Sequence, residues 1–221
     1  MRDGEQTLEI AILLFDGTTH LDSVGPYEVL HNLPDADVKF VAKQRGIYHD
    51  KCGMLGLAAE FTIGDVMRPD VLLVPGGGGA DAASEDPEIT DWVAAVHETT
   101  AWTTSVCTGA LILGGAGLLK GLKATTHWRA METLSSVHGA EATHDRVVRQ
   151  GKVITAAGVS SGIDMALTLA AEIAGDDVAQ AIQLGIEYDP QPPFAAGRFT
   201  EAPEDRIAMW RAGLNKTKRS H

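Results

Sequence analysis

The sequence contains little cysteine. Cys52 and Cys107 are the two cysteines among 221 residues, too few for a disulfide framework in a chain of this size. Such a low content suits a reducing compartment better than a secretory route. The polar N-terminus has no apolar segment of the kind found in signal peptides. We therefore expect a cytoplasmic protein.

Long apolar runs and an excess of positive charge are also missing. No apolar stretch approaches the roughly 20 residues that span a bilayer, so we expect no membrane partner. The chain has 18 basic and 30 acidic residues and a net charge of −12, and most of such a surface repels nucleic acid. The one basic cluster, 216–219, is interpreted as a solvated tail. The histidines and cysteines show no metal-ligand spacing, so no metal is expected.

Apolar runs alternate with helical patterns along the chain. Residues 8–15 form a continuous apolar run, which is typical of a central strand buried on both faces. Further strands are expected over 37–42, 70–75 and 102–106. The glycine-rich stretch 53–57 is expected to be part of a hairpin or bulge, and 147–156 a hairpin that turns at 150–151. Helices are expected over 87–100 with Asp86 as a cap, 108–119, 160–174 and 176–187. This order predicts an α/β fold with a mostly parallel sheet flanked by helices.

The length and composition predict one domain over 1–221. Residues 1–7 are expected to be a flexible N-terminus. The proline-rich stretch 189–196 lies too near the end of the chain to separate a second domain. It is expected to lead to a final helix over about 203–215, which wraps this domain or a partner subunit, followed by a tail.

The segment around Cys107 carries the strongest chemical signal. A β-prone run ends abruptly at Cys107, and the small residues Gly109 and Ala110 then open an apolar helix. This pattern is typical of a nucleophile elbow, a sharp turn that lifts a reactive side chain out of the sheet. The N–H groups of a helix N-terminus favour a thiolate, so a lowered pKa is expected. The alternative is a buried core cysteine.

Two other elements follow strand ends and so are expected to lie near Cys107. Thr108 follows the cysteine directly, and it can cap the helix or orient a substrate or water. The glycines at 76–79 fit neither a dinucleotide fingerprint nor a phosphate loop. They form either a flexible turn or a cradle of free N–H groups that faces the thiol, with Gly77 and Gly78 as the expected donors.

Asp22 and His127 are the candidate acid/base groups. Asp22 follows the first strand, and its default role is to cap or enter a short helix. Beside Cys107 it would instead share a proton with the thiol, because two adjacent anions repel each other. His127 follows a strand-like triplet, and it is either a base for Cys107 or a structural histidine bonded to the backbone.

Four motifs of the sequence resemble the DJ-1/PfpI superfamily: PGGG at 75–78, SVCTG at 105–109, GLL at 117–119 and ATTHW at 124–128. The resemblance extends from Ile10 to about Pro193. It implies a flavodoxin-like three-layer sandwich, a homodimer and a cysteine nucleophile at the elbow, here Cys107.

Within the superfamily, the sequence is most similar to the isocyanide hydratase branch, through 21–26, 105–109, 158–164 and 184–194. Many members place a glutamate beside the cysteine, whereas this chain has Asp22, as that branch does. The resemblance implies a cofactor-independent hydro-lyase that hydrates a small-molecule isocyanide to the formamide. It assigns Cys107 to a thioimidate intermediate and Asp22 to acid/base work, with the amides of Gly77, Gly78 and Thr108 around the reacting atoms.

Other functions fit the same scaffold. A Cys-His amidase would need His127 within reach of the Cys107 sulfur. A redox-sensing or protective protein would use oxidation of Cys107. Similar domains also sense ligands in AraC-type regulators, but those carry a basic helix-turn-helix region, which is not expected in this acidic chain.

Overall fold

The structure is a computed structural model that describes residues 7–213. The chain divides into two compact units, the first ending at Glu187 and the second beginning at Tyr188. The first unit contains every strand and the helices up to α7, and the second contains α8 (Glu204–Ala212). The final helix expected over about 203–215 therefore forms. The basic cluster 216–219 and residues 1–6 lie outside the described residues, and the prediction of a single domain over 1–221 stays a prediction.

The core of the first unit is a seven-stranded sheet with the order β10-β11-β7-β6-β1-β2-β5. All neighbouring strands are parallel except β10 and β11. The strands are β1 (Leu8–Leu13), β2 (Ala36–Ala42), β5 (Phe61–Thr62), β6 (Val71–Val74), β7 (Trp102–Val106), β10 (Val147–Gln150) and β11 (Val153–Ala156). The expected α/β fold with a mostly parallel sheet is confirmed.

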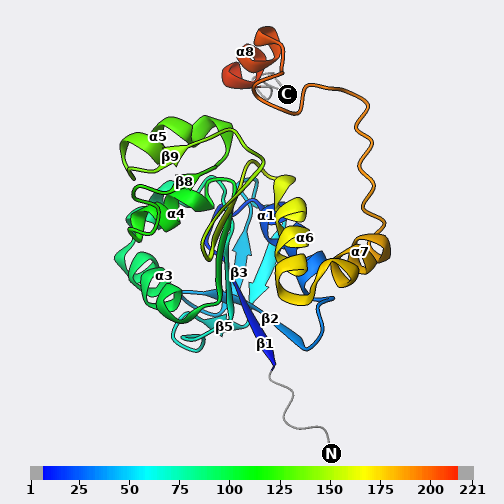
Figure 1. Cartoon of the computed structure of the whole chain (residues 1–221). Coiled ribbons are helices and arrows are strands. Elements are labelled where there is room, and N and C mark those ends of the chain that lie inside the picture. Colours follow the sequence, from blue (N-terminus) through cyan, green and yellow to red (C-terminus); the bar gives the residue numbers. More distant parts are fainter. Residues whose placement is uncertain (1–6, 214–221) are drawn as a thin grey trace, which may run out of the picture. The chain divides into compact units, whose positions relative to one another are not determined.

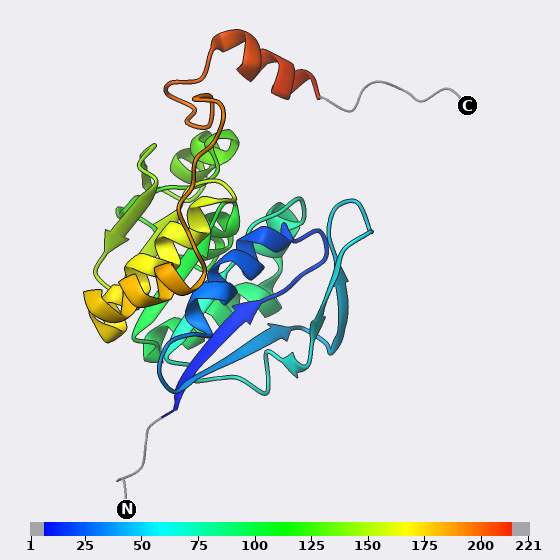
Figure 2. The same ribbon diagram turned by 90° about the vertical axis from the view of Figure 1, so that its right-hand side faces the viewer.

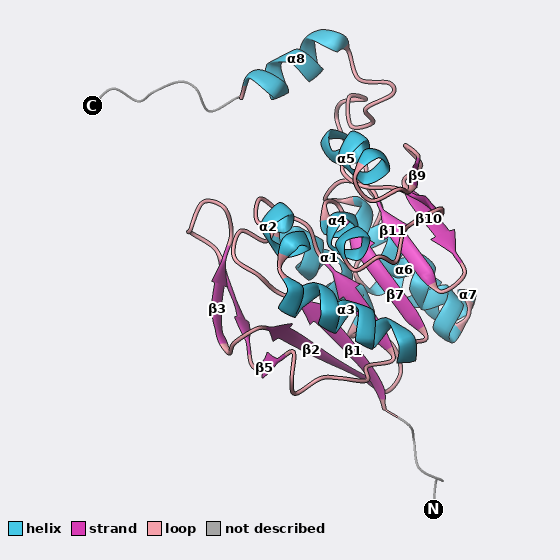
Figure 3. Ribbon diagram, turned by 90° about the vertical axis from the view of Figure 1, so that its left-hand side faces the viewer, coloured by secondary structure: helices cyan, strands magenta, loops and turns pink. Residues whose placement is uncertain are grey.

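Helices cover both faces of this sheet (Figures 1 and 3). One face carries α1 (His20–Leu30), α6 (Ser161–Ala174) and α7 (Asp176–Gly185), which are turned toward the viewer in Figure 2. The other face carries α2 (Ala80–Glu85), α3 (Pro87–Thr99), α4 (Gly109–Gly115) and α5 (Met131–Ser136). No helix within residues 7–213 is long and apolar enough to cross a membrane.

The side chains of β1 show why its sequence is apolar from Ile10 to Leu13. Ile10 and Ile12 are buried in the core cluster beneath α1 and α6, whereas Ala11 and Leu13 are buried in the cluster beneath α3 and α4. Successive strand side chains point to opposite faces. A strand covered by helices on both faces is therefore apolar along its buried part, and its one polar residue, Glu9, lies near the start of the strand and pairs with Lys39.

Two pairs of strands lie outside this main sheet. β3 (Gly46–His49) and β4 (Gly56–Ala59) form a separate antiparallel hairpin, which the glycine-rich stretch 53–57 predicted. β8 (Lys123–Ala124) and β9 (Glu141–Ala142) form a short parallel pair, and a 3-10 helix (Trp128–Ala130) precedes α5.

Several elements end earlier than expected: the strand expected over 8–15 ends at Leu13, the final helix ends at Ala212, and two further helices are also shorter. The helix expected over 108–119 ends at Gly115, because glycines crowd its C-terminus and Gly117 adopts a positive φ of 78°. The helix expected over 176–187 ends at Gly185. The hairpin over 147–156 turns at Gly151, whose φ is 60°, as expected.

Candidate active site

The sharp turn expected at Cys107 is present. β7 ends at Val106, Cys107 adopts a φ of +58°, and α4 begins at Gly109. A non-glycine residue in the left-handed region is uncommon and is retained only where its surroundings hold it. Here the Cys107 N–H donates to the Ala157 carbonyl at 2.9 Å, and the Thr126 hydroxyl donates to the Cys107 carbonyl at 2.8 Å.

The loop after β6 packs directly against this turn, and glycine makes the approach possible. A Cβ on Gly76 would lie 2.4 Å from the Thr108 nitrogen, and one on Gly109 would lie 2.1 Å from the Val74 carbonyl oxygen. The Thr108 hydroxyl accepts a hydrogen bond from the Gly77 N–H at 2.9 Å and donates to the Gly77 carbonyl at 3.2 Å. This hydroxyl therefore fastens the loop to the turn and does not cap α4.

Asp22 lies in the first turn of α1, directly across from that loop. It is 0% exposed, and its Oδ2 accepts a hydrogen bond from the Gly76 N–H at 3.0 Å. The helix-capping position belongs to Thr19, so Asp22 enters the helix in its first turn and does not cap it. Within residues 7–213 its second oxygen, Oδ1, is buried without a hydrogen-bond partner. One carboxylate oxygen is thus anchored and the other is available for chemistry.

Burial dominates the electrostatics of the Asp22–Cys107 pair. Desolvation raises the pKa of Asp22 to about 7, against the opposing effects of the Gly76 N–H and of Cys107. Cys107 is 5% exposed. Its pKa is raised to about 12, first by desolvation and then by the negative charge of Asp22.

The expectation that the helix N-terminus lowers the pKa of Cys107 is wrong. The amides of Thr108 and Val159 do favour a thiolate, but burial and the neighbouring carboxylate outweigh them. The resting pair therefore holds its proton on sulfur, with Asp22 ionising near neutral pH. Because the pKa of Asp22 is lower than that of Cys107, Asp22 is a base placed beside a neutral thiol.

His127 is held by other groups. Its Nδ1 accepts a hydrogen bond from the Arg129 N–H at 3.3 Å, and a Cβ on Gly158 would lie 2.7 Å from its Cδ2 atom. Its pKa is lowered, first by desolvation and then by the charge of Arg129. The groups that shift the pKa of Cys107 are Asp22, Val159 and Thr108. The imidazole is therefore held by backbone groups, and it is not among the groups that shift the pKa of the Cys107 thiol.

The two glycines predicted as donors have different surroundings. The Gly77 N–H is bonded to the Thr108 hydroxyl. Gly78 faces the tip of the β3–β4 hairpin, where a Cβ would meet the Lys51 side chain at 3.5 Å. The amides that act on the sulfur are those of Thr108 and Val159.

Three groups of the site escaped the sequence-based prediction: the N–H of Gly76, the N–H of Val159 and the hydroxyl of Thr126. Gly76 and Thr126 lie in motifs that the sequence highlighted, but their individual roles depend on which atoms meet in the fold. Val159 adopts a positive φ of 27° at the start of α6. A backbone amide has no residue-type signature, so no sequence signal pointed to it.

No metal-binding cluster is found in the described part of the chain, since no three His, Cys, Asp or Glu side chains between residues 7 and 213 converge. The chemistry that these residues can perform on their own is proton transfer and attack by sulfur.

The buried Asp22 carboxyl is expected to make the free energy of unfolding depend on pH. Its pKa rises from an ordinary 3.8 to about 7, so the carboxylate destabilises the fold by up to about 4 kcal/mol above pH 7 and by nothing below pH ~4. We expect Asp22→Asn to raise the free energy of unfolding at pH 8, and the gain to shrink as the pH falls to 4. Urea unfolding at both pH values measures this difference. An equal gain at pH 4 and pH 8 would contradict the buried-carboxylate account.

The sequence is similar to a known protein family and to a characterised enzyme. Residues 8–172 match a sequence model described as the DJ-1/PfpI family. The chain is 44% identical over 196 residues to the isonitrile hydratase of Pseudomonas putida, a match that covers 89% of this chain and 85% of that protein.

Solved structures agree with the sequence comparison. A ThiJ/PfpI family protein from Pseudomonas syringae is 40% identical and superposes with a TM-score of 0.88, covering 94% of this chain and 86% of the other. DJ-1beta of Drosophila melanogaster superposes with a TM-score of 0.75 over 84% of this chain and 100% of its own, at 20% identity. The second likeness concerns the fold alone.

Proposed function

The chain belongs to the DJ-1/PfpI family, and within that family we propose that it is an isocyanide hydratase, which converts R–N≡C and water into the formamide R–NH–CHO. The observation that carries the proposal is the buried pair of Cys107 and Asp22, a neutral thiol beside a carboxyl group with a pKa of about 7. Similarity to an isonitrile hydratase over most of the chain supports it.

The burial of the thiol favours a substrate with a narrow reactive end. Cys107 is 5% exposed and Asp22 is fully buried, so a bulky scissile group such as a peptide would have to displace the surrounding structure. An isocyanide ends in a linear N≡C group whose terminal carbon accepts a soft nucleophile. This terminus can reach a recessed sulfur.

In the first step, the sulfur adds to the isocyanide carbon. Oδ1 of Asp22 takes the thiol proton as the C–S bond forms and returns it to the same carbon, giving the thioimidate R–N=CH–S. Oδ2 stays bonded to the Gly76 N–H. The amides of Thr108 and Val159 stabilise negative charge on the sulfur while it reacts.

In the second step, water adds to the thioimidate carbon. Asp22 takes a proton from the water as the C–O bond forms and passes it to the imine nitrogen, which gives R–NH–CH(OH)–S. The C–S bond then breaks, the hydroxyl proton returns to the sulfur through Asp22, and R–NH–CHO leaves. The cycle adds one water, restores the thiol and needs no electron acceptor. Gly77 and Gly78 stay in the proposal as part of the loop that shapes this site, with the Thr108 hydroxyl holding the loop in place.

The elevated pKa of Cys107 argues against the alternative of a redox sensor. Peroxides oxidise thiolates, and sensor cysteines are exposed and have a low pKa. Cys107 is buried, and its pKa is raised to about 12. The homodimer implied by the resemblance stays a prediction, to be checked by sedimentation.

The substrate test compares two reactions. Purified, reduced protein is given cyclohexyl isocyanide in one assay and N-cyclohexylformamide in another. We expect catalytic loss of the isocyanide with formation of the formamide, and no hydrolysis of the formamide to amine and formate. Hydrolysis of the amide with the isocyanide left intact would overturn the proposal in favour of an amidase.

His127 distinguishes the same two mechanisms. We expect His127→Asn to keep isocyanide turnover within about tenfold of wild type, because Asn can still accept the hydrogen bond from the Arg129 N–H and Asp22 supplies the base. A histidine that served as the general base would contribute about 10²–10⁴-fold. Steady-state kinetics measures the difference, and a loss of that size would assign the base to His127.

A further inference from the structure

A cavity of about 350 Å³ opens at the carboxyl ends of β1 and β2. Its volume is in the range of pockets that hold small molecules. The side chains of Phe15, Ala83 and Ile89 give it an apolar floor. This position, beside the central strand of an open α/β sheet, is where such folds commonly bind ligands.

The cavity and the Cys107 site are both formed in part by the loops after β1 and β6. Different residues of these loops line each of them. The loops after β1 and β6 are joined by a bridge between Thr18 and Gly77. Gly76 and Gly77 bond to Asp22 and Thr108.

The cavity lies at the other ends of these loops, where Asp16 and Gly79 line it. A Cβ on Gly79 would lie 2.0 Å from the Asp16 carbonyl oxygen, so the two loops also touch at this end. The cavity is therefore a separate site next to the same loop pair.

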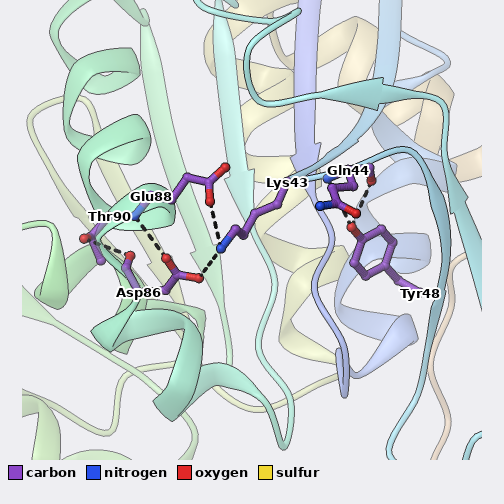
Figure 4. Close-up of polar contacts among 6 residues, drawn as sticks. All are labelled: Lys43, Gln44, Tyr48, Asp86, Glu88 and Thr90. Atoms are coloured by element: carbon purple, nitrogen blue, oxygen red, sulfur yellow. Dashed lines mark hydrogen bonds and ion pairs between the residues drawn. The ribbon is translucent and has the colours of Figure 1, made fainter.

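Lys43, the lysine in the lining of the cavity, already forms ion pairs with two carboxylates. The Lys43 Nζ lies 2.8 Å from a carboxylate oxygen of Asp86 and 2.8 Å from one of Glu88. In Figure 4 the Lys43 side chain points toward these two residues, with Gln44 and Tyr48 on its other side. The two carboxylates raise the pKa of Lys43 and keep it charged. The Tyr48 hydroxyl donates to the Gln44 carbonyl at 2.9 Å.

The charge balance at the cavity is negative. Asp16 lines the cavity with an exposed side chain, and its carboxylate forms none of the ion pairs found within residues 7–213. The charged residues of the lining are Asp16 and Asp86, which are acidic, and Lys43, which is basic; Glu88, which also pairs with Lys43, lies outside the lining. An anion would be repelled, and a neutral molecule would lack the charge–charge attraction that the Asp16 carboxylate offers a cation.

We propose that this cavity binds a small organic ammonium ion, whose apolar part packs against Phe15 and Ile89 while its ammonium group lies near Asp16. The site is independent of the isocyanide chemistry, because none of these residues takes part in it. The apolar floor selects a hydrocarbon body, and the unpaired carboxylate selects the positive charge.

Binding of three matched probes to the full chain tests this assignment. Cyclohexylammonium, cyclohexanol and cyclohexanecarboxylate share one ring and differ in charge. We expect the ammonium ion to bind saturably, with the neutral and anionic probes at least about fivefold weaker, as measured by chemical-shift changes in NMR titrations. The same binding should persist in Cys107→Ala. No saturable ammonium binding, equal binding of cyclohexanol, or loss of binding in Cys107→Ala would each overturn the proposal.

Two variants locate the bound ion. Ala82→Leu places a larger side chain on an exposed α2 position that lines the cavity, and Asp16→Asn removes the unpaired charge. Each should weaken binding of cyclohexylammonium by at least about fivefold. Asp81→Asn, on α2 but outside the lining, is the matched control and should bind like wild type. Circular dichroism verifies that the variants fold, and undiminished binding by folded Ala82→Leu would contradict the location.

Discussion

Replacement of Cys107 by alanine is expected to reduce isocyanide turnover by on the order of 10⁴-fold or more, to the level of buffer alone. Loss of a covalent nucleophile in other enzymes has effects of this size. No other described sulfur can substitute, because Cys52 lies exposed on the β3–β4 hairpin. Initial rates of formamide formation measure the loss.

Cys52→Ala is the matched control for that experiment. It removes the other cysteine of the chain and should leave the rate within about twofold of wild type. If Cys107→Ala kept measurable catalysis while Cys52→Ala lost it, the nucleophile would be misassigned. If both variants turned over normally, sulfur would take no part in the reaction.

Asp22→Asn is expected to lower turnover by about 10²–10⁴-fold, the usual contribution of a general acid/base. Asparagine keeps the shape of the side chain and an oxygen to accept the Gly76 N–H, but it cannot take the proton of the thiol. The same variant is expected to be more stable than wild type at pH 8, so unfolding cannot explain a lost rate. Turnover close to wild type would remove Asp22 from the mechanism.

The pH profile gives an independent measure of the same group. Because the base form of Asp22 is the carboxylate and its pKa is raised to about 7, kcat/KM of the wild type should rise as the pH increases through 7. Asp22→Asn should lack that rise. A wild-type profile that is flat between pH 6 and 8 would mean that no group with this pKa controls the reaction.

The sequence predicted the fold well because its strands are buried on both faces. A continuous apolar run such as 8–15 has few alternatives to a central strand, and glycines with positive φ, such as Gly151, marked turns accurately. The end of α4 was predicted four residues too late, because apolar periodicity continues through Leu118 and Leu119 after the glycines have already ended the helix.

The site was predicted less completely. Strand ends and family resemblance brought Cys107, Asp22 and the glycine loop into one region. The direction of the thiol pKa was wrong because it depends on the depth of burial and on a carboxylate far away in sequence. The functions of the Gly76 and Val159 amides were not predictable, since any residue type carries an N–H and only the folded chain shows which ones face the reacting groups.

Enzymatic addition of water to an isocyanide leaves an oxygen atom from the solvent in the product. We would therefore analyse by mass spectrometry the product formed from cyclohexyl isocyanide in water enriched in oxygen-18. We expect many turnovers per protein and a formamide that carries one heavy oxygen. Loss of only one isocyanide per protein molecule with no formamide released, or a formamide without the heavy oxygen, would contradict the proposed hydratase activity.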